Sequence, residues 1–109
     1  VDKSFSIDEC LTINSSTVTA HTAVAGEQIF AITNTNAITI TLPATAVTGD
    51  EVTIIDGGNF FGSNNVIVNR NSHKINAGTS NLTLSVNGQA STLVYANATV
   101  GWVLKSTNQ

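Results

Sequence analysis

Charged residues are scarce in this sequence. Only 10% of its 109 residues are Asp, Glu, Lys or Arg, against about 25% in an ordinary soluble domain. Four residues are Lys or Arg, and the net charge is −3. Binding along a phosphate backbone requires a basic stripe on the protein surface. The composition therefore argues against nucleic acid as a partner.

Cysteine and long apolar runs are also nearly absent. Cys10 is the single cysteine, so the chain forms no intrachain disulfide. No apolar run approaches the roughly 18 residues of a membrane span, so we expect no membrane partner. A basic start followed by an apolar stretch is missing too, so we expect no signal peptide. A chain this small without disulfides needs another source of stability, and oligomerisation is the expected one.

Neutral polar residues and short alternating runs make up most of the chain. Thr, Asn and Ser account for 39 of the 109 residues, and 41% of residues are hydrophobic. Apolar residues recur with period two, which is typical of half-buried strands. The expected strands are Gln28–Thr33, Ala37–Leu42, Glu51–Ile55, Asn65–Asn69, Asn81–Val86, Ser91–Tyr95 and Val100–Leu104. The last two are more apolar, so we expect both of their faces to be covered.

The first part of the chain has a different character. Residues 1–24 form a charged, Ser-rich lead-in with weaker candidate strands at Ser4–Ile7, Cys10–Ile13 and Thr17–Val24, and residues 25–109 form a β domain. We expect the lead-in to act as an arm, with Phe5 and Ile7 on one face of an extended segment. The alternative is that Cys10–Ile13 is an integral strand of the domain.

The pattern as a whole predicts an all-β fold. About nine or ten short strands in one compact domain favour a β-sandwich, a barrel-like fold or a β-prism. We expect it to assemble as an oligomer. No fixed repeat appears, which argues against a long solenoid.

The residues that carry most enzyme chemistry are few and scattered. His21 and His73 are the two histidines, and we expect the first on a strand surface and the second in a solvated loop. With Cys10 they are too few for a zinc site. Asp56–Asn59 could offer oxygens to calcium, but a plain turn is the better interpretation. We therefore predict no catalytic residues, no metal, no cofactor and no enzymatic activity.

Aromatic residues give the candidate contacts. Phe60 and Phe61 follow the Asp56–Asn59 turn, and they either fold under the sheet or enter the surface of a partner. Trp102 is expected in the core, with a sugar-stacking platform as the alternative. Tyr95 and Leu104 are candidate packing residues of the core or of the contacts between subunits.

The order of several segments resembles a known module. These segments are Ala31–Thr35, Ile38–Ala44, Gly49–Asp56, Asn64–Val68, Lys74–Asn76, Leu82–Leu84, Thr92–Tyr95 and Gly101–Val103. Together they resemble a β-rich module of tailed-bacteriophage virion proteins, which is found in tail fibres, tailspikes and small head-decoration proteins. The resemblance covers about Gly26 to Leu104. It is a pattern of strands and turns and not a catalytic signature. Members often have Gly after the Lys-Ile-Asn strand, where this chain has Ala77 before Gly78.

The resemblance implies a function in the virion. Such modules are typically trimeric, and the shortness of the chain favours a capsid decoration (cement) protein. It would bind the major capsid protein lattice on the outer surface of the capsid, with Phe5, Ile7, Phe60 and Phe61 as candidate contacts. The alternative is a tail-fibre or tailspike module that binds a host-surface glycan.

Overall fold

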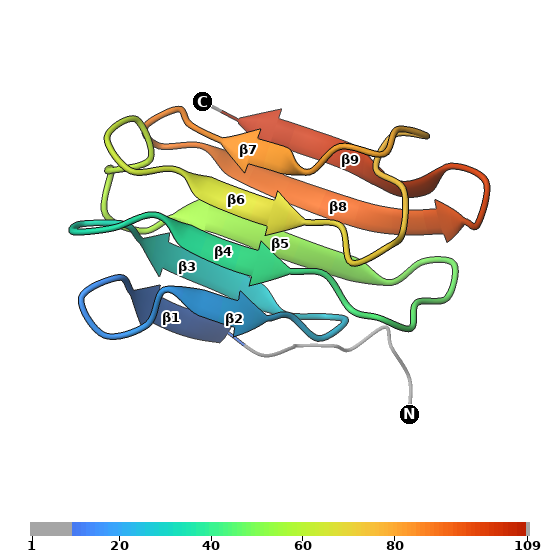
Figure 1. The fold of residues 1–109 in the computed structure, drawn as a ribbon, viewed down its shortest axis with the longest axis horizontal. Coiled ribbons are helices and arrows are strands. Elements are labelled where there is room, and N and C mark those ends of the chain that lie inside the picture. The colour runs from blue at the N-terminus through green and yellow to red at the C-terminus, as the bar shows by residue number, and fades with distance from the viewer. Residues whose placement is uncertain (1–9, 109) are drawn as a thin grey trace.

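The protein is all-β over the residues that its structure describes. The computed structural model describes residues 10–108, which form nine strands and no helix. Figure 1 shows how these strands are arranged. The strands are β1 (Cys10–Asn14), β2 (Ala20–Thr22), β3 (Gln28–Ile32), β4 (Ile38–Thr41), β5 (Glu51–Asp56), β6 (Val66–Asn69), β7 (Leu82–Leu84), β8 (Ala90–Asn97) and β9 (Gly101–Asn108). The all-β prediction is therefore confirmed, and each strand expected after residue 25 is present with slightly different ends.

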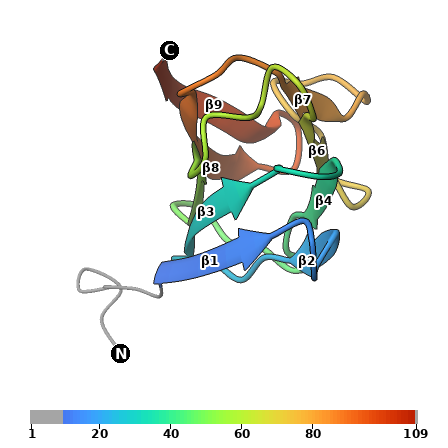
Figure 2. The same ribbon diagram turned by 90° about the vertical axis from the view of Figure 1, so that its left-hand side faces the viewer.

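The strands lie in two sheets that enclose one core. Five strands pair in the order β1-β3-β5-β8-β9, and four pair in the order β2-β4-β6-β7. Figure 2 shows the two sheets on opposite sides of the molecule. Within residues 10–108 the strands do not close into a barrel.

The first six strands alternate between the sheets and wind into three coils. β1, β3 and β5 pair in parallel in one sheet, and β2, β4 and β6 pair in parallel in the other. The coils differ in length, because Cys10 pairs with Gln28 whereas Gln28 pairs with Thr53. The chain from β3 to β5 is therefore longer than the chain from β1 to β3. This inequality explains why a coiled arrangement leaves no fixed repeat in the sequence.

The last three strands pair antiparallel with their neighbours. β7 pairs antiparallel with β6, and β8 pairs antiparallel with both β5 and β9. Both sheets are therefore mixed. β1 and β2 are edge strands at one end of the strand order, and β9 and β7 are the edges at the other.

Alternating burial places the core between the sheets. Ile29 of β3 and Ile54 of β5 are in register and fully buried, and so are Ile40 of β4 and Val68 of β6. Each fully buried side chain of this size contributes about 1.5–3 kcal/mol. Trp102 is the largest buried side chain, and its ring meets that of Tyr95 edge to face at 5.4 Å.

The lead-in contributes to both sheets. β1 pairs with β3 along its whole length, and Ile13 and Ala23 are buried in the core. The alternative, an integral strand at Cys10–Ile13, is thus what the structure shows for that segment. Phe5, Ile7 and the candidate strand Ser4–Ile7 lie outside the described residues.

Candidate interaction surface

The outer faces of the two sheets differ in chemistry. In the five-stranded sheet, the partly exposed side chains that point away from the core include Phe30, Ile32, Ile55, Val94 and Val103. We call this surface the apolar face. In the four-stranded sheet, the corresponding positions are mostly polar: Thr22, Thr39, Thr41, Asn69 and Thr83, with Ile67 among them. The outer face of the five-stranded sheet is therefore the more apolar of the two.

The register of the strands joins the apolar face into rows. Phe30 of β3 lies beside Ile55 of β5, which lies beside Ala90 of β8. A second row joins Val94 of β8 to Val103 of β9. Cross-strand neighbours of this kind have Cβ atoms about 5 Å apart, so each row forms a short apolar strip. The first strip ends at Thr12 of β1, and the second ends at Glu51 of β5.

The rest of this face is polar, and it includes Thr12, Asn14 and Gln28 at the outward positions of β1 and β3. Between the two apolar rows, the hydroxyl groups of Thr53 and Thr92 are 3.0 Å apart and bonded to each other. At one corner, Lys105 Nζ lies 3.3 Å from Glu51 Oε2, and both side chains are about half exposed. The cation and the anion cancel, so this face carries no net charge from the pair.

The prediction that both faces of β8 and β9 are covered is wrong for this chain alone. In β8, buried and partly exposed residues alternate, and Val94 and Val103 belong to the partly exposed set. The physical reason is that the core lies on one side of the five-stranded sheet, while the other side is its outer surface. The apolar residues on that surface are what the sequence pattern detected.

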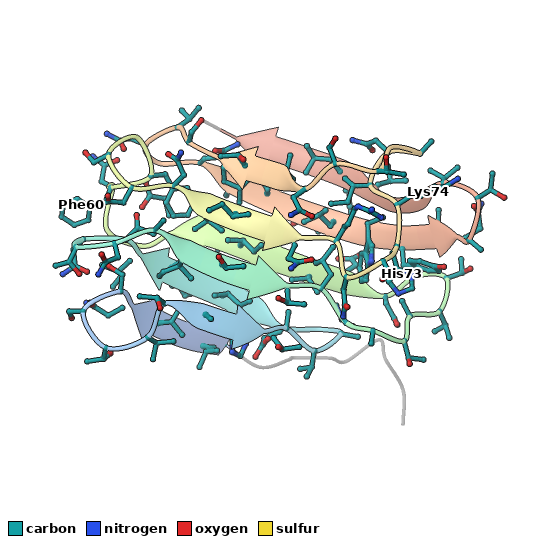
Figure 3. The ribbon with its side chains drawn as sticks, viewed as in Figure 1. Phe60, His73 and Lys74 are labelled. Atoms are coloured by element: carbon teal, nitrogen blue, oxygen red, sulfur yellow. The ribbon has the colours of Figure 1, made fainter. Side chains whose placement is uncertain are left out.

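Phe60 lies at one end of the molecule. Its side chain is 39% exposed, whereas that of Phe61 is fully buried. Figure 3 shows Phe60 projecting away from the strands. A Cβ atom on Gly58 would lie within 3 Å of both Phe60 and Ile32. The exposed ring therefore adjoins the Ile32 end of the apolar face. Phe61 therefore folds under the sheet and is not available as a contact in this chain, whereas Phe60 is exposed.

The carboxylate of Asp56 fixes the loop that carries these rings. Oδ1 accepts hydrogen bonds from the backbone N–H groups of Gly58, Asn59 and Phe60, at 3.2, 2.8 and 3.1 Å. Oδ2 accepts from Phe61 at 3.2 Å and from Gly88 at 2.9 Å. A single side chain therefore satisfies five backbone donors and closes the turn.

The same contacts shift the acidity of the carboxyl group. Burial by itself raises the pKa of Asp56, but the hydrogen bonds from Gly88, Phe61, Phe60 and Gly58 outweigh it and hold the pKa below its ordinary value of 3.8. The ionised form is therefore the one that the loop stabilises. These oxygens are occupied by backbone donors, which agrees with the interpretation of Asp56–Asn59 as a turn.

A second segment ties this loop to the neighbouring turn. The side-chain oxygen of Asn87 accepts a 2.7 Å hydrogen bond from the backbone N–H of Gly62. Gly88, at a φ of 80°, is the residue that brings its N–H to Asp56. Phe60 is thus presented by a loop that is held at both ends.

The opposite end of the molecule holds the predicted packing residues. Tyr95 and Trp102 are buried, and Leu104 packs partly buried against the core. The burial of Trp102 argues against a sugar-stacking platform at that position. Figure 3 shows His73 and Lys74 at the end of the molecule away from Phe60.

His73 is less solvated than its loop position predicts. Its Nε2 is 2.8 Å from the carbonyl oxygen of Ala44, and its ring lies edge to face against Tyr95 at 5.4 Å. The reason is that the segment around Lys74 packs directly onto β9: Trp102 donates a 2.7 Å backbone hydrogen bond to the carbonyl oxygen of Lys74. Gly101 permits this approach, since a Cβ there would lie 1.9 Å from that oxygen.

His21 also departs from its expected surface position. It lies on the inner side of β2, and its Nε2 is 2.9 Å from Oε1 of Glu27. Glu27 is only 7% exposed and accepts a further bond from the backbone N–H of Val24. A buried carboxylate needs such partners, and Glu27 was not singled out from the sequence because nothing in its local pattern marks it as buried.

Metal-ligating groups stay apart in the part of the chain that is described. Residues 10–108 bring no three His, Cys, Asp or Glu side chains together in a way that could hold an ion. Cys10 is exposed at the β1 edge, and its sulfur is 3.5 Å from the amide nitrogen of Gln28. Within the same range, no helix has the length and apolar character to cross a membrane.

Comparison with known proteins adds no relative. No protein-family model matches the chain, and no curated protein sequence matches it.

Proposed function

We propose that this chain is a non-enzymatic structural protein of a tailed-phage virion, and specifically a capsid decoration (cement) protein. It binds as a homotrimer to the major capsid protein lattice on the outer surface of the capsid and stabilises the head. The observation that carries the proposal is the contrast between the two outer faces: one has large apolar side chains on four of its strands, and the other has mostly threonine with Ile67 as its large apolar side chain. The order of segments that resembles phage virion modules supports the choice of a virion.

The chemistry of the faces suits such a component. A decoration protein must keep one surface in water and bury another against its neighbours. The threonine side chains of the four-stranded sheet hydrate well and keep a high β propensity. The apolar face gains free energy when a partner removes it from water, at about 25 cal/mol per Å².

The absence of an enzyme function is part of this proposal. His21 and Glu27 are an acid and a base in contact, but Glu27 is buried and bonded to the backbone of Val24. The contact between His21 and Glu27 therefore has a structural role at the end of the core, where β2 is the edge strand. A general base must instead reach the proton of a bound substrate.

Phe60 is the candidate contact with the capsid shell. It is an exposed aromatic side chain on a loop that Asp56 holds rigid, and aromatic side chains dominate protein interfaces. The segment with Phe5 and Ile7 is a second candidate for this contact.

The same ring supports the alternative function. An exposed aromatic ring on a loop that also carries the side-chain amide of Asn59 has the chemistry that stacks on a sugar and bonds to its hydroxyl groups. A tail-fibre or tailspike module that binds a host-surface glycan would use it in that way.

The copy number in purified virions separates the two functions. A decoration protein is present in hundreds of copies per virion, and a fibre component in tens or fewer. Binding to purified empty shells then tests the contact: Phe60→Ser should weaken it at least about tenfold. Val47→Ser is the matched control, because Val47 is 61% exposed in the loop between β4 and β5. Unchanged shell binding by Phe60→Ser would remove that residue from the contact.

A further inference from the structure

We infer that the apolar face of the five-stranded sheet is the surface through which copies of this chain contact one another. The inference deepens the proposed function, since it names the surface that joins the subunits, and it rests on that proposal only for the number of copies. The partner that binds the apolar face is a second copy of the chain.

The chemistry of the face carries the first step. Phe30, Ile55, Val94 and Val103 are large apolar side chains at strand positions that point away from the core, where the other sheet has threonine. Scattered apolar residues on a surface are ordinary, but joined rows of them across adjacent strands are not. The register places Phe30 beside Ile55 and Val94 beside Val103.

The area of the face carries the second step. Five strands spaced about 4.8 Å apart, each five to eight residues long, span about 24 Å by 17–26 Å. The whole outer surface of the sheet, with its polar positions included, is therefore about 400–600 Å² in each copy. Two copies together bury about 800–1,200 Å², which reaches the roughly 1,000 Å² of a specific interface. Three copies that turn this face toward a common axis would bury more.

The charge of the face carries the third step. The chain has a net charge of −3, yet the charged groups of this face, Glu51 and Lys105, pair with each other. Two copies can therefore approach through this face without bringing like charges together. A partner protein selected for charge complementarity would find nothing to pair with here, which favours a second copy.

Two matched pairs of substitutions test the inference. The first pair is Ile55→Thr on the apolar face and Ile67→Thr on the outer face of β6, which make the same chemical change on opposite sheets. The second pair is Thr53→Lys on the apolar face and Thr39→Lys on β4, which add a like charge without removing an apolar group. Circular dichroism and melting temperature check that each variant is folded.

The readout is the mass in solution by light scattering over a range of concentrations. We expect the wild type to be a multiple of 11.3 kDa. Ile55→Thr and Thr53→Lys should each weaken association at least about tenfold, and Ile67→Thr and Thr39→Lys should leave it unchanged. A monomeric wild type at about 100 μM, or equal effects of each substitution and its control, would overturn the inference.

Shell binding distinguishes this inference from the proposed function. If the face variants associate as the wild type does and the wild type still binds shells, the inference falls and the function stands. If only the face variants dissociate but the wild type does not bind shells, the inference stands and the function falls.

Discussion

Replacing Asp56 by asparagine tests how the Phe60 loop is held. The substitution keeps the size of the side chain and one acceptor oxygen, which can still serve Gly58, Asn59 and Phe60. The second oxygen becomes an NH₂ group that faces the N–H groups of Phe61 and Gly88. Two hydrogen bonds are lost, and donors are placed against donors.

The expected cost follows from the number of bonds and their exposure. Each bond to a charged acceptor stabilises by up to about 3 kcal/mol, but Asp56 is only partly buried, so about 0.5–1.5 kcal/mol each is the better figure. Asp56→Asn should therefore cost about 1–3 kcal/mol, which corresponds to a fall in melting temperature of about 4–12 °C. Asp56→Ala removes all five bonds and should cost more.

The pH dependence of stability tests the contribution of Asp56 most directly. The pKa of Asp56 in the folded protein lies below 3.8, so its stabilising effect is complete above pH 3.8 and is lost as the pH falls through the folded value. Urea unfolding at pH 7 should separate Asp56→Asn from the wild type, and the gap should shrink at pH 3. Glu51→Gln, which alters an exposed ion pair, is the control and should cost under about 0.5 kcal/mol. An Asn variant as stable as the wild type at pH 7, or a gap that persists at pH 3, would refute this account of the loop.

Three further predictions concern backbone conformation and the lead-in. Gly101→Ala should cost more than about 3 kcal/mol in urea unfolding, because its Cβ would lie 1.9 Å from a backbone oxygen, whereas Gly49→Ala has open space and should show only the strain of its φ of 97°. Equal costs would contradict the clash. Ala77→Gly should raise the melting temperature by a few degrees, about 0.5–1 kcal/mol, because Ala77 has a φ of 65°; a lower melting temperature would show that no strain is relieved. Deleting residues 1–9 should leave a domain that melts normally, whereas deleting residues 1–14 also removes β1 and should lower the melting temperature sharply. Equal melting temperatures of the two truncated proteins would mean that β1 adds nothing to the fold.

The strands were predictable because each one is marked by a local alternation of apolar and polar residues. Val52 and Ile54 alternate with Glu51 and Thr53, and burial in β5 follows that alternation. The Asp56–Asn59 turn was predictable for the same reason, since Asp, Gly and Asn favour turns wherever they occur. Short-range signals of this kind need no knowledge of the rest of the fold.

The pairing of the strands was not predictable, because it depends on distant segments. Three parallel coils of unequal length leave no period for a sequence comparison to find. The inward orientation of His21 depends on Glu27, which the fold buries six residues later. Likewise, Phe60 and Phe61 are adjacent residues of the same type, so the sequence does not distinguish them. The geometry around Asp56 decides which ring is buried.

The most direct test of the proposed function is the position of the chain in an electron cryomicroscopy reconstruction of the virion that contains it. We expect density for this fold in many copies on the outer surface of the capsid. In it, the apolar faces should meet between copies, the Phe60 loop should contact the shell, and the threonine face should be exposed to solvent. Density for the fold on the tail alone, or copies that meet through the threonine face, would contradict the account.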